Sequence, residues 1–171
     1  MTLNPLEKQP RSLPYGIHPL DVFFNPRSIA LIGATNKPKR VGRTILWNLV
    51  SYAHSALIYP VNPKYSSLYG FKAYPSIESI SDPIDLAVIV VPNTQVLDLV
   101  QSCANKGVKG LIIISAGFKE LGPKGIILEK NILEIIRAYN IRVIGPNCLG
   151  VMNPITGINA TFAGTMALPG N

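Results

Sequence analysis

Short apolar segments alternate with helical patterns along this chain, and this alternation is the strongest constraint on its fold. Residues 85–91 (DLAVIVV) are almost continuously apolar and rich in β-branched side chains, which is typical of a central strand in a parallel sheet. Further strands are expected at 29–32, 56–61, 110–114 and 142–144, and helices at 44–51, from a cap at 92–94 to Lys106, and at 124–139. The predicted fold class is α/β: a Rossmann-like, doubly wound, mostly parallel sheet with helices on both faces.

The remaining segments define the expected domain boundaries. Residues 1–20 hold four prolines and little periodicity, so they are predicted to be a flexible leader, and 21–26 the approach to the first strand. A short strand is expected at 71–74 and a small helical turn at 76–80. The domain itself is placed at 21–168, and 169–171 are interpreted as a truncated link to an absent following domain.

Composition limits the class of protein. A chain of 171 residues suits one domain with a substantial core, and 47% apolar against 15% charged residues predicts elements covered on both sides. Two cysteines, Cys103 and Cys148, are too few for a disulfide framework and wrongly spaced for a metal cluster, which fits a reducing compartment. No apolar run reaches the roughly 18 residues of a membrane span. We therefore expect a cytoplasmic protein with no membrane partner and no metal.

Positive charge is concentrated in one turn. The first predicted strand ends at Gly33, a helical pattern opens near Gly42, and the turn between them carries Lys37, Lys39 and Arg40, with Arg43 just beyond. A strand that leads into a helix start brings unpaired N–H groups together, which favours an anion. The net charge of +7 fits an anionic partner. Nucleic acid is not expected, because the cations do not stripe a helix and no aromatic-rich or zinc-binding motif accompanies them.

The carboxyl ends of all five predicted strands are followed by turns rich in glycine, proline, asparagine and serine. In an open α/β sheet, ligands bind outside these ends. Lys64 occupies the region where NAD-binding domains usually offer an acidic residue to the ribose, so a phosphorylated ribose is favoured. The eight residues between Gly33 and Gly42 match neither the dinucleotide nor the Walker fingerprint. The turns are Gly33-Ala34-Thr35, Asn62-Pro63-Lys64, Val91-Pro92-Asn93, Ser115-Ala116-Gly117 and Gly145-Pro146-Asn147-Cys148.

Several of these segments together resemble a known family. They include IALIGATNKPKRVGRTILWNL, IYPVNPKY, DLAVIVVP, GVKGLIIISAGFKELG, IRVIGPNCLGVMNP and INATFA. In this order they are similar to the N-terminal CoA-binding domain of the NDP-forming acyl-CoA synthetases. These include the ADP-forming acetate–CoA ligases, which are related to the succinyl-CoA synthetase alpha subunit. The same module precedes a GNAT domain in some protein acetyltransferases. The resemblance covers roughly residues 20–168.

The resemblance implies a ligand and a site. The ligand would be coenzyme A or an acyl-CoA. Its diphosphate would lie on the segment from Thr35 to Gly42, and its ribose phosphate beside Lys64. Val91 and Pro92 would contact adenine, Ser115 and Ala116 the pantetheine arm, and Asn147 and Cys148 the thiol end. The complete expected site is Gly33, Ala34, Thr35, Lys37, Arg40, Val41, Gly42, Asn62, Pro63, Lys64, Tyr74, Val91, Pro92, Asn93, Ser115, Ala116, Gly117, Asn147 and Cys148.

Some roles stay open at this point. Lys64 is either a phosphate ligand or a solvated turn residue, Tyr74 either stacks on the ligand or packs, and Cys148 is more consistent with packing than with catalysis. His18 and His54 match no phosphohistidine motif and are expected at the surface.

The chain is therefore not expected to catalyse acyl-CoA synthesis alone, and no catalytic residue is assigned. Its expected partners are phosphohistidine and ATP-grasp domains, or a GNAT domain. The alternatives are an acyl-CoA-sensing module and an NADP-binding domain. The acyl group is left open.

Overall fold

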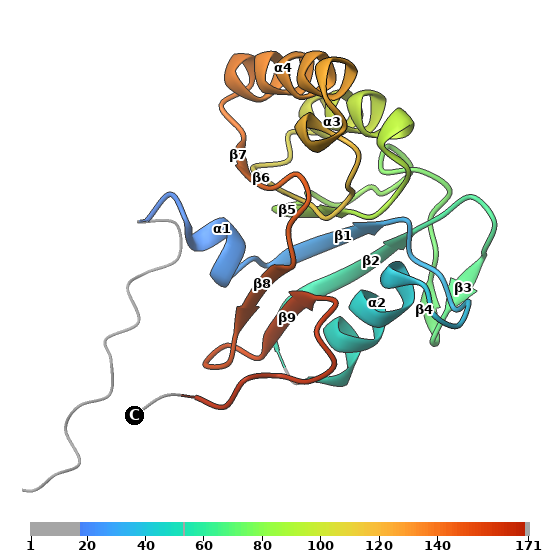
Figure 1. The fold of residues 1–171 in the computed structure, drawn as a ribbon. Helices are drawn as coiled ribbons and strands as arrows, with labels where there is room; N and C mark the ends of the chain where they lie inside the picture. The colour runs from blue at the N-terminus through green and yellow to red at the C-terminus, as the bar shows by residue number, and fades with distance from the viewer. Residues whose placement is uncertain (1–17, 53, 170–171) are drawn as a thin grey trace, which may run out of the picture.

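A five-stranded parallel sheet forms the centre of the computed structural model, which describes residues 18–52 and 54–169 (Figure 1). Its strands stand in the order β2-β1-β5-β6-β7, and every neighbouring pair is parallel. Along the chain this order is second, first, third, fourth, fifth, one of the two common doubly wound orders. The predicted fold class is confirmed. The strands are β1 (Ser28–Ile32), β2 (Leu57–Val61), β5 (Leu86–Ile89), β6 (Gly110–Ile113) and β7 (Arg142–Ile144).

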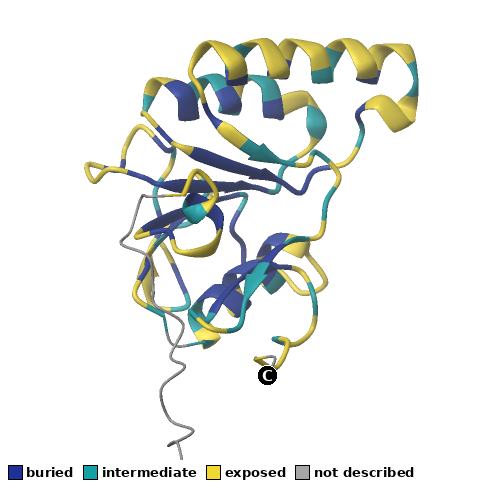
Figure 2. Cartoon of the chain, turned by 90° about the vertical axis from the view of Figure 1, so that its left-hand side faces the viewer, coloured by how far each residue is buried: buried dark blue, intermediate teal, exposed yellow. Residues whose placement is uncertain are grey.

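Helices cover both faces of this sheet, and each face has its own core (Figures 1 and 2). On one face lie α3 (Val96–Asn105) and α4 (Pro123–Ala138), and on the other α2 (Val41–Ser51) with the short α1 (Asp21–Phe24). Side chains along β1 alternate between the two: Ala30 and Ile32 join the core under α3 and α4, while Ile29 and Leu31 join the core under α2. All residues of β1 are buried, which explains why residues 29–32, after Ser28, are apolar without interruption.

An antiparallel hairpin completes the face covered by α2. It consists of β8 (Gly150–Asn153) and β9 (Ile158–Thr161), and it buries Val151, Ile158 and Ala160 in the same core. The Asn48 amide of α2 donates to the carbonyls of Thr161 (2.9 Å) and Ala163 (2.8 Å), which fixes the hairpin to the helix. The sequence analysis predicted no strands here. Two short apolar runs flanking an Asn-Pro-Ile-Thr-Gly turn were the available signal.

Three local predictions need correction, whereas the small turn predicted at 76–80 is present, closed by a bond from Ile80 N–H to the Ile77 carbonyl (3.2 Å). Residues 21–24 form α1, because a helical turn buries Val22 and Phe23 together. The strand expected at 71–74 is shorter: β4 (Phe71–Lys72) pairs with β3 (Ser67–Leu68), and Tyr74 makes only an isolated bridge to Val61.

The predicted helix cap at 92–94 is also wrong. A 3-10 turn, η1 (Asn93–Gln95), precedes α3, and no side chain caps either element. A second such turn, η2 (Lys119–Leu121), precedes α4.

The amino ends of three strands are joined by Asp85. Its buried carboxylate accepts hydrogen bonds from Arg27 N–H and from Lys109 Nζ, each 3.0 Å long, and its N–H donates to Ser28 Oγ (2.8 Å). These contacts connect β1, β5 and β6 at the edge opposite the predicted site.

The sequence predicts no membrane span and no metal site, and the structure bears on both only over the residues that it describes. None of the helices at 18–52 and 54–169 is long and apolar enough to cross a membrane. Over the same ranges, no group of three or more His, Cys, Asp or Glu side chains could hold a metal ion. Most of the leader predicted at 1–20, and residues 170–171 of the predicted link, lie outside the described residues.

Candidate functional site

Two glycines bring the loop after β1 into close contact with its neighbours. Gly33 has a φ of +97°, and a Cβ at this position would lie 2.2 Å from the Val90 carbonyl oxygen. A Cβ on Gly42 would lie 2.2 Å from the Gly33 carbonyl oxygen. The carboxyl end of β1, the end of β5 and the start of α2 therefore meet here, where only glycine leaves enough room.

The basic loop forms one end of this edge. The side chains of Lys37, Lys39 and Arg40 are exposed. Helix α2 begins at Val41 without a side-chain cap, so no capping side chain occupies the N–H groups that precede the first helical bond, from Arg43 N–H to the Arg40 carbonyl (3.0 Å). Exposed cations around such a helix start form a site with affinity for an anion. Arg43 differs from the other cations, because its Nε donates to the Tyr69 hydroxyl (2.9 Å).

The turn after β2 is tied to this loop by two side chains. The Asn62 amide donates to the Ala34 carbonyl (2.7 Å), and its Oδ1 accepts from Lys64 N–H (3.0 Å). The hydroxyls of Tyr65 and Thr35 are hydrogen-bonded (3.1 Å). Lys64 is exposed, next to Pro63. Tyr65 was missed by the sequence analysis, although it directly follows Lys64.

Tyr74 lies near the carboxyl end of β2 but packs within the protein. Its ring centroid lies 5.8 Å from that of Tyr59, and Lys72 Nζ lies 4.8 Å from the Tyr74 centroid. The Tyr74 N–H donates to the Pro60 carbonyl, and the Tyr74 carbonyl accepts from Asn62 N–H. These contacts pack Tyr74 against its neighbours, and its contact with a ligand stays a prediction.

The ends of β5 and β6 are joined through side chains. The Ser115 hydroxyl donates to the Val91 carbonyl (2.6 Å) and accepts from Val91 N–H (3.2 Å). The Asn93 amide, instead of capping a helix, donates to the Gly117 carbonyl (2.5 Å). Glu120 was not predicted: its carboxylate accepts from Gly117 N–H (2.6 Å), and this bond lowers the pKa of that carboxyl. Pro92 and Ala116 are exposed beside these contacts.

The turn after β7 is the far end of this edge. Asn147 N–H donates to the Ser115 carbonyl (2.9 Å), so this turn is joined to the previous one. A cavity of about 310 Å³ opens beside it, lined by Lys119, Glu120, Glu129, Gly145, Pro146 and Asn147.

Cys148 belongs to the same turn and is partly buried. Its thiol donates to the Ile113 carbonyl (3.4 Å), and burial raises the pKa of this thiol. The protonated thiol is therefore favoured at neutral pH.

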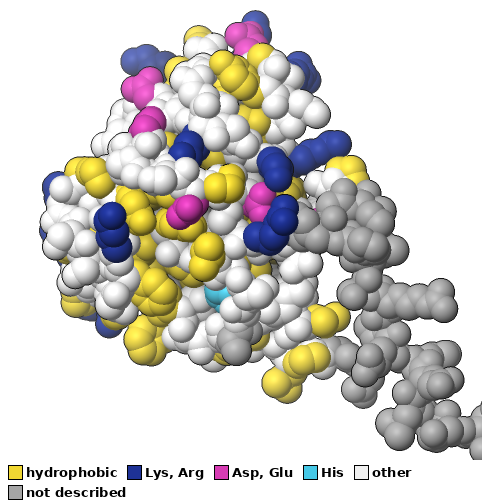
Figure 3. Space-filling view, turned by 180° about the vertical axis from the view of Figure 1, so that it is seen from behind, with side chains coloured by type: hydrophobic (Ala, Val, Ile, Leu, Met, Phe, Trp, Pro, Cys, Tyr) yellow, Lys and Arg dark blue, Asp and Glu magenta, His cyan; other side chains and the backbone are white. Residues whose placement is uncertain are grey.

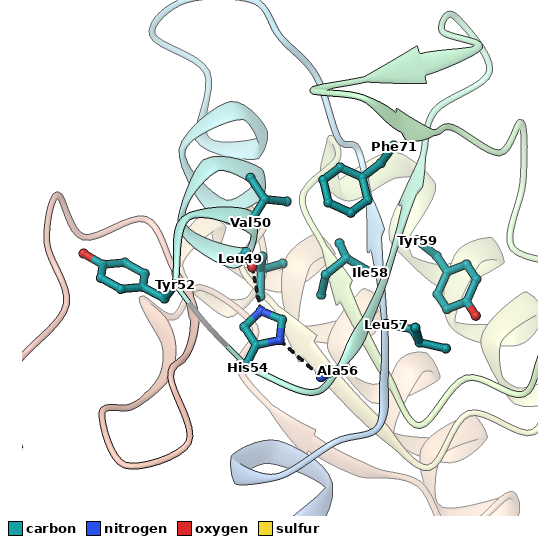
Figure 4. Close-up of a pocket in the computed structure, with 9 residues that line it drawn as sticks. All are labelled: Leu49, Val50, Tyr52, His54, Ala56, Leu57, Ile58, Tyr59 and Phe71. Atoms are coloured by element: carbon teal, nitrogen blue, oxygen red, sulfur yellow. Dashed lines mark hydrogen bonds between the residues drawn. The ribbon is translucent and has the colours of Figure 1, made fainter.

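A second cavity lies beside the edge strand β2 (Figure 4). It measures about 380 Å³ and is lined mainly by apolar side chains from the end of α2 and the start of β2. Figure 3 shows hydrophobic side chains gathered on the rear face, beside a histidine. His54 lines the cavity, but its ring nitrogens contact the Leu49 carbonyl (2.5 Å) and Ala56 N–H (3.2 Å). His54 is partly exposed and His18 is exposed, so the prediction that both lie at the surface is not contradicted. The cavity lacks the charged groups of the carboxyl edge.

Comparison with known proteins identifies relatives of this chain. The family described as "CoA binding domain" matches residues 27–154. Acetate–CoA ligase (ADP-forming) II subunit alpha of Pyrococcus furiosus is 48% identical over 152 residues, which cover 89% of this chain and 33% of the subunit. Acetate–CoA ligase (ADP-forming) of Methanocaldococcus jannaschii is 51% identical over 138 residues, covering 81% of this chain and 19% of the ligase.

A solved structure agrees with these relatives. The crystal structure of PH0766 from Pyrococcus horikoshii OT3 has a TM-score of 0.85 at 50% identity, covering 89% of this chain and 34% of that one. This chain therefore spans about a third or less of the length of these relatives.

Proposed function

Because this chain belongs to the family of CoA binding domains and is homologous to alpha subunits of ADP-forming acetate–CoA ligases, we propose that its carboxyl edge binds coenzyme A, free or acylated. The observation that carries the proposal is the attachment of the Lys64 turn to the basic loop by Asn62. Two segments suited to phosphates are thereby held side by side. Coenzyme A carries a diphosphate and a separate ribose phosphate, which such a pair of segments can bind.

The ligand is proposed to lie along the edge from the basic loop to the β7 turn. Backbone N–H groups from Thr35 to Gly42, with Lys37 and Arg40, would hold the diphosphate. Lys64 would pair with the ribose phosphate. The neighbouring pairs would serve the rest of the ligand: Val91 and Pro92 the adenine, Ser115 and Ala116 the pantetheine arm, Asn147 and Cys148 the thiol end.

The protein to which this region contributes is proposed to be an acid–CoA ligase of the ADP-forming type, acting in the cytoplasm. Such an enzyme interconverts acyl-CoA, ADP and phosphate with the acid, CoA and ATP. The relatives are three or more times longer than their match to this chain, which supports the proposal that phosphohistidine and ATP-grasp parts lie in other domains or subunits. In this scheme the described domain binds CoA and is not catalytic alone. The named relatives are ligases, and a GNAT partner is not favoured.

Calorimetric titration with CoA, acetyl-CoA, dephospho-CoA and NADPH tests the proposal. CoA should bind more tightly than dephospho-CoA, and Lys64→Ala should shrink this difference. A charge-assisted phosphate contact is worth about 1.5–3 kcal/mol, so CoA affinity should fall about tenfold or more. Lys130→Ala, an exposed lysine on α4, is the matched control and should leave both affinities unchanged. Binding of NADPH without binding of CoA would refute the proposal.

A further inference from the structure

Lys64 lies between two side chains that both reach across to the basic loop. On its amino side, Asn62 bonds to the Ala34 carbonyl (2.7 Å). On its carboxyl side, the Tyr65 hydroxyl bonds to Thr35 Oγ1 (3.1 Å). Two side chains that flank Lys64 are thus bonded to two neighbouring loop residues, Ala34 and Thr35. Lys64 itself is exposed.

The Thr35 hydroxyl joins two segments, the basic loop and the turn after β2. It accepts Lys37 N–H (3.2 Å) from within the loop and is bonded to Tyr65 from the turn after β2. Thr35 is buried, with 8% of its surface exposed, and Tyr65 is half-buried. A hydroxyl pair has two O–H donors, and their mutual bond uses one. The bond therefore fixes the turn against the loop and leaves one O–H at this position free to donate.

We propose that Tyr65 is a positioning residue that sets the distance between the diphosphate loop and Lys64, and thereby selects ligands with a ribose phosphate. The inference rests on the proposed function and extends it to a residue with no predicted ligand contact. The loop is also attached by a bond from Gly33 N–H to the Val61 carbonyl (3.0 Å) and by the Asn62 amide, and neither bond involves Tyr65. The carboxyl side of the Lys64 turn is closed by a bond from Tyr65 N–H to the Asn62 carbonyl (3.3 Å), and the Tyr65 hydroxyl attaches this side to the loop.

The physical reason is the cost of ordering a long, exposed lysine. Immobilising such a side chain on binding costs conformational entropy, and a backbone that is free to shift adds to that cost. A turn held on both sides of Lys64 is already partly ordered before the ligand binds, so less conformational entropy is lost on binding. A ligand without the ribose phosphate does not engage Lys64 and gains nothing from the tether.

The test is Tyr65→Phe, which removes the hydroxyl and keeps the ring. CoA affinity should fall about three- to tenfold, as expected for the loss of one hydrogen bond, and dephospho-CoA affinity by less than about twofold. The ratio of the two affinities is a readout that a general loss of stability would not move. Tyr139→Phe is the matched control, because its hydroxyl contacts Asn105 and Gln101 near the other end of the domain, and it should leave the ratio unchanged.

A double-mutant cycle with Thr35→Val examines the same bond from its other side. In the Thr35→Val background, Tyr65→Phe should no longer change the affinity ratio, because the partner hydroxyl is already absent. If Tyr65→Phe lowered the affinity for both ligands equally, or left the CoA affinity unchanged, the inference about Tyr65 would be overturned. The proposed function, CoA binding at this edge, would not be affected by that result. If the unmodified chain binds neither ligand, the proposed function itself fails.

Discussion

Ser115 and Val91 are joined by two hydrogen bonds through a single hydroxyl. Ser115 Oγ donates to the Val91 carbonyl at 2.6 Å and accepts from Val91 N–H at 3.2 Å. Serine can do both because its hydroxyl is a donor and an acceptor. The pair links the carboxyl ends of adjacent strands β5 and β6, and places side by side the segments proposed for adenine and for pantetheine.

Ser115→Ala should destabilise the domain by about 1–3 kcal/mol, because it leaves both Val91 backbone groups without this partner. Urea denaturation measures the change. Ser81→Ala, at an exposed position, is the control and should have little effect. An unchanged free energy of unfolding for Ser115→Ala would show that water replaces the hydroxyl at no cost.

Gly42→Ala should also destabilise the domain, by about 1–3 kcal/mol, because the new Cβ would meet the Gly33 carbonyl oxygen at 2.2 Å. That oxygen belongs to the backbone, so α2 or the loop must shift, and CoA binding should weaken with it. Gly164→Ala is the control: nothing lies within 4 Å of its added Cβ. Thermal denaturation and CoA titration of both variants are the measurements, and equal melting temperatures would contradict the close approach.

The stability of the domain should fall at alkaline pH as Tyr59 ionises. Burial, followed by a hydrogen bond from its hydroxyl to Asp82 (2.8 Å), raises the pKa of Tyr59 from 10.0 to about 12. The neutral phenol is thus favoured in the folded state. Its contribution to stability should be complete below about pH 10 and should be lost as the pH rises toward about 12.

Unfolding free energies measured across this alkaline range check the prediction. Tyr59→Phe should show a shallower decline than the unmodified protein, and Tyr139→Phe, at an exposed position, should retain the original slope. Identical slopes in all three proteins would exclude a role for Tyr59 in the alkaline transition.

The two cysteines should differ from free thiols in reactivity. Burial raises the pKa of Cys103 to about 12, and burial also raises the pKa of the partly buried Cys148. Near pH 8 both should react with iodoacetamide more slowly than in the denatured protein, and Cys103 more slowly than Cys148. CoA should slow the labelling of Cys148 and not of Cys103, as followed by mass spectrometry. Labelling of Cys148 that CoA does not change would place the thiol end of the ligand elsewhere.

The sequence patterns predicted the sheet correctly because parallel strands buried on both faces are strongly apolar, as β5 and residues 29–32 of β1 are. Elements stabilised by distant contacts were harder to predict. The hairpin of β8 and β9 depends on the α2 core and on Asn48, a residue more than one hundred positions away. Helix α1, with only four residues, exists because Val22 and Phe23 enter that same core.

In the candidate site, too, the position of each turn was predictable from the sequence and the contacts between turns were not. Gly33, Lys64, Ser115 and Asn147 could be assigned to one edge from the order of strands and turns, since parallel strands present their carboxyl ends together. The contacts among them could not. Asn93 was predicted to cap a helix and instead holds Gly117, and Tyr65 was not singled out although it bonds to Thr35.

By itself, then, the sequence determined the α/β class, the basic loop, the glycine positions and the family, because these depend on local pattern and composition. The tertiary structure alone decided which side chains tie the turns together and how Lys64 is held beside the loop. The physical reason is that a hydrogen bond between side chains depends on ångström-scale distances. Those distances follow from the packing of strands and helices, and no spacing along the chain encodes them.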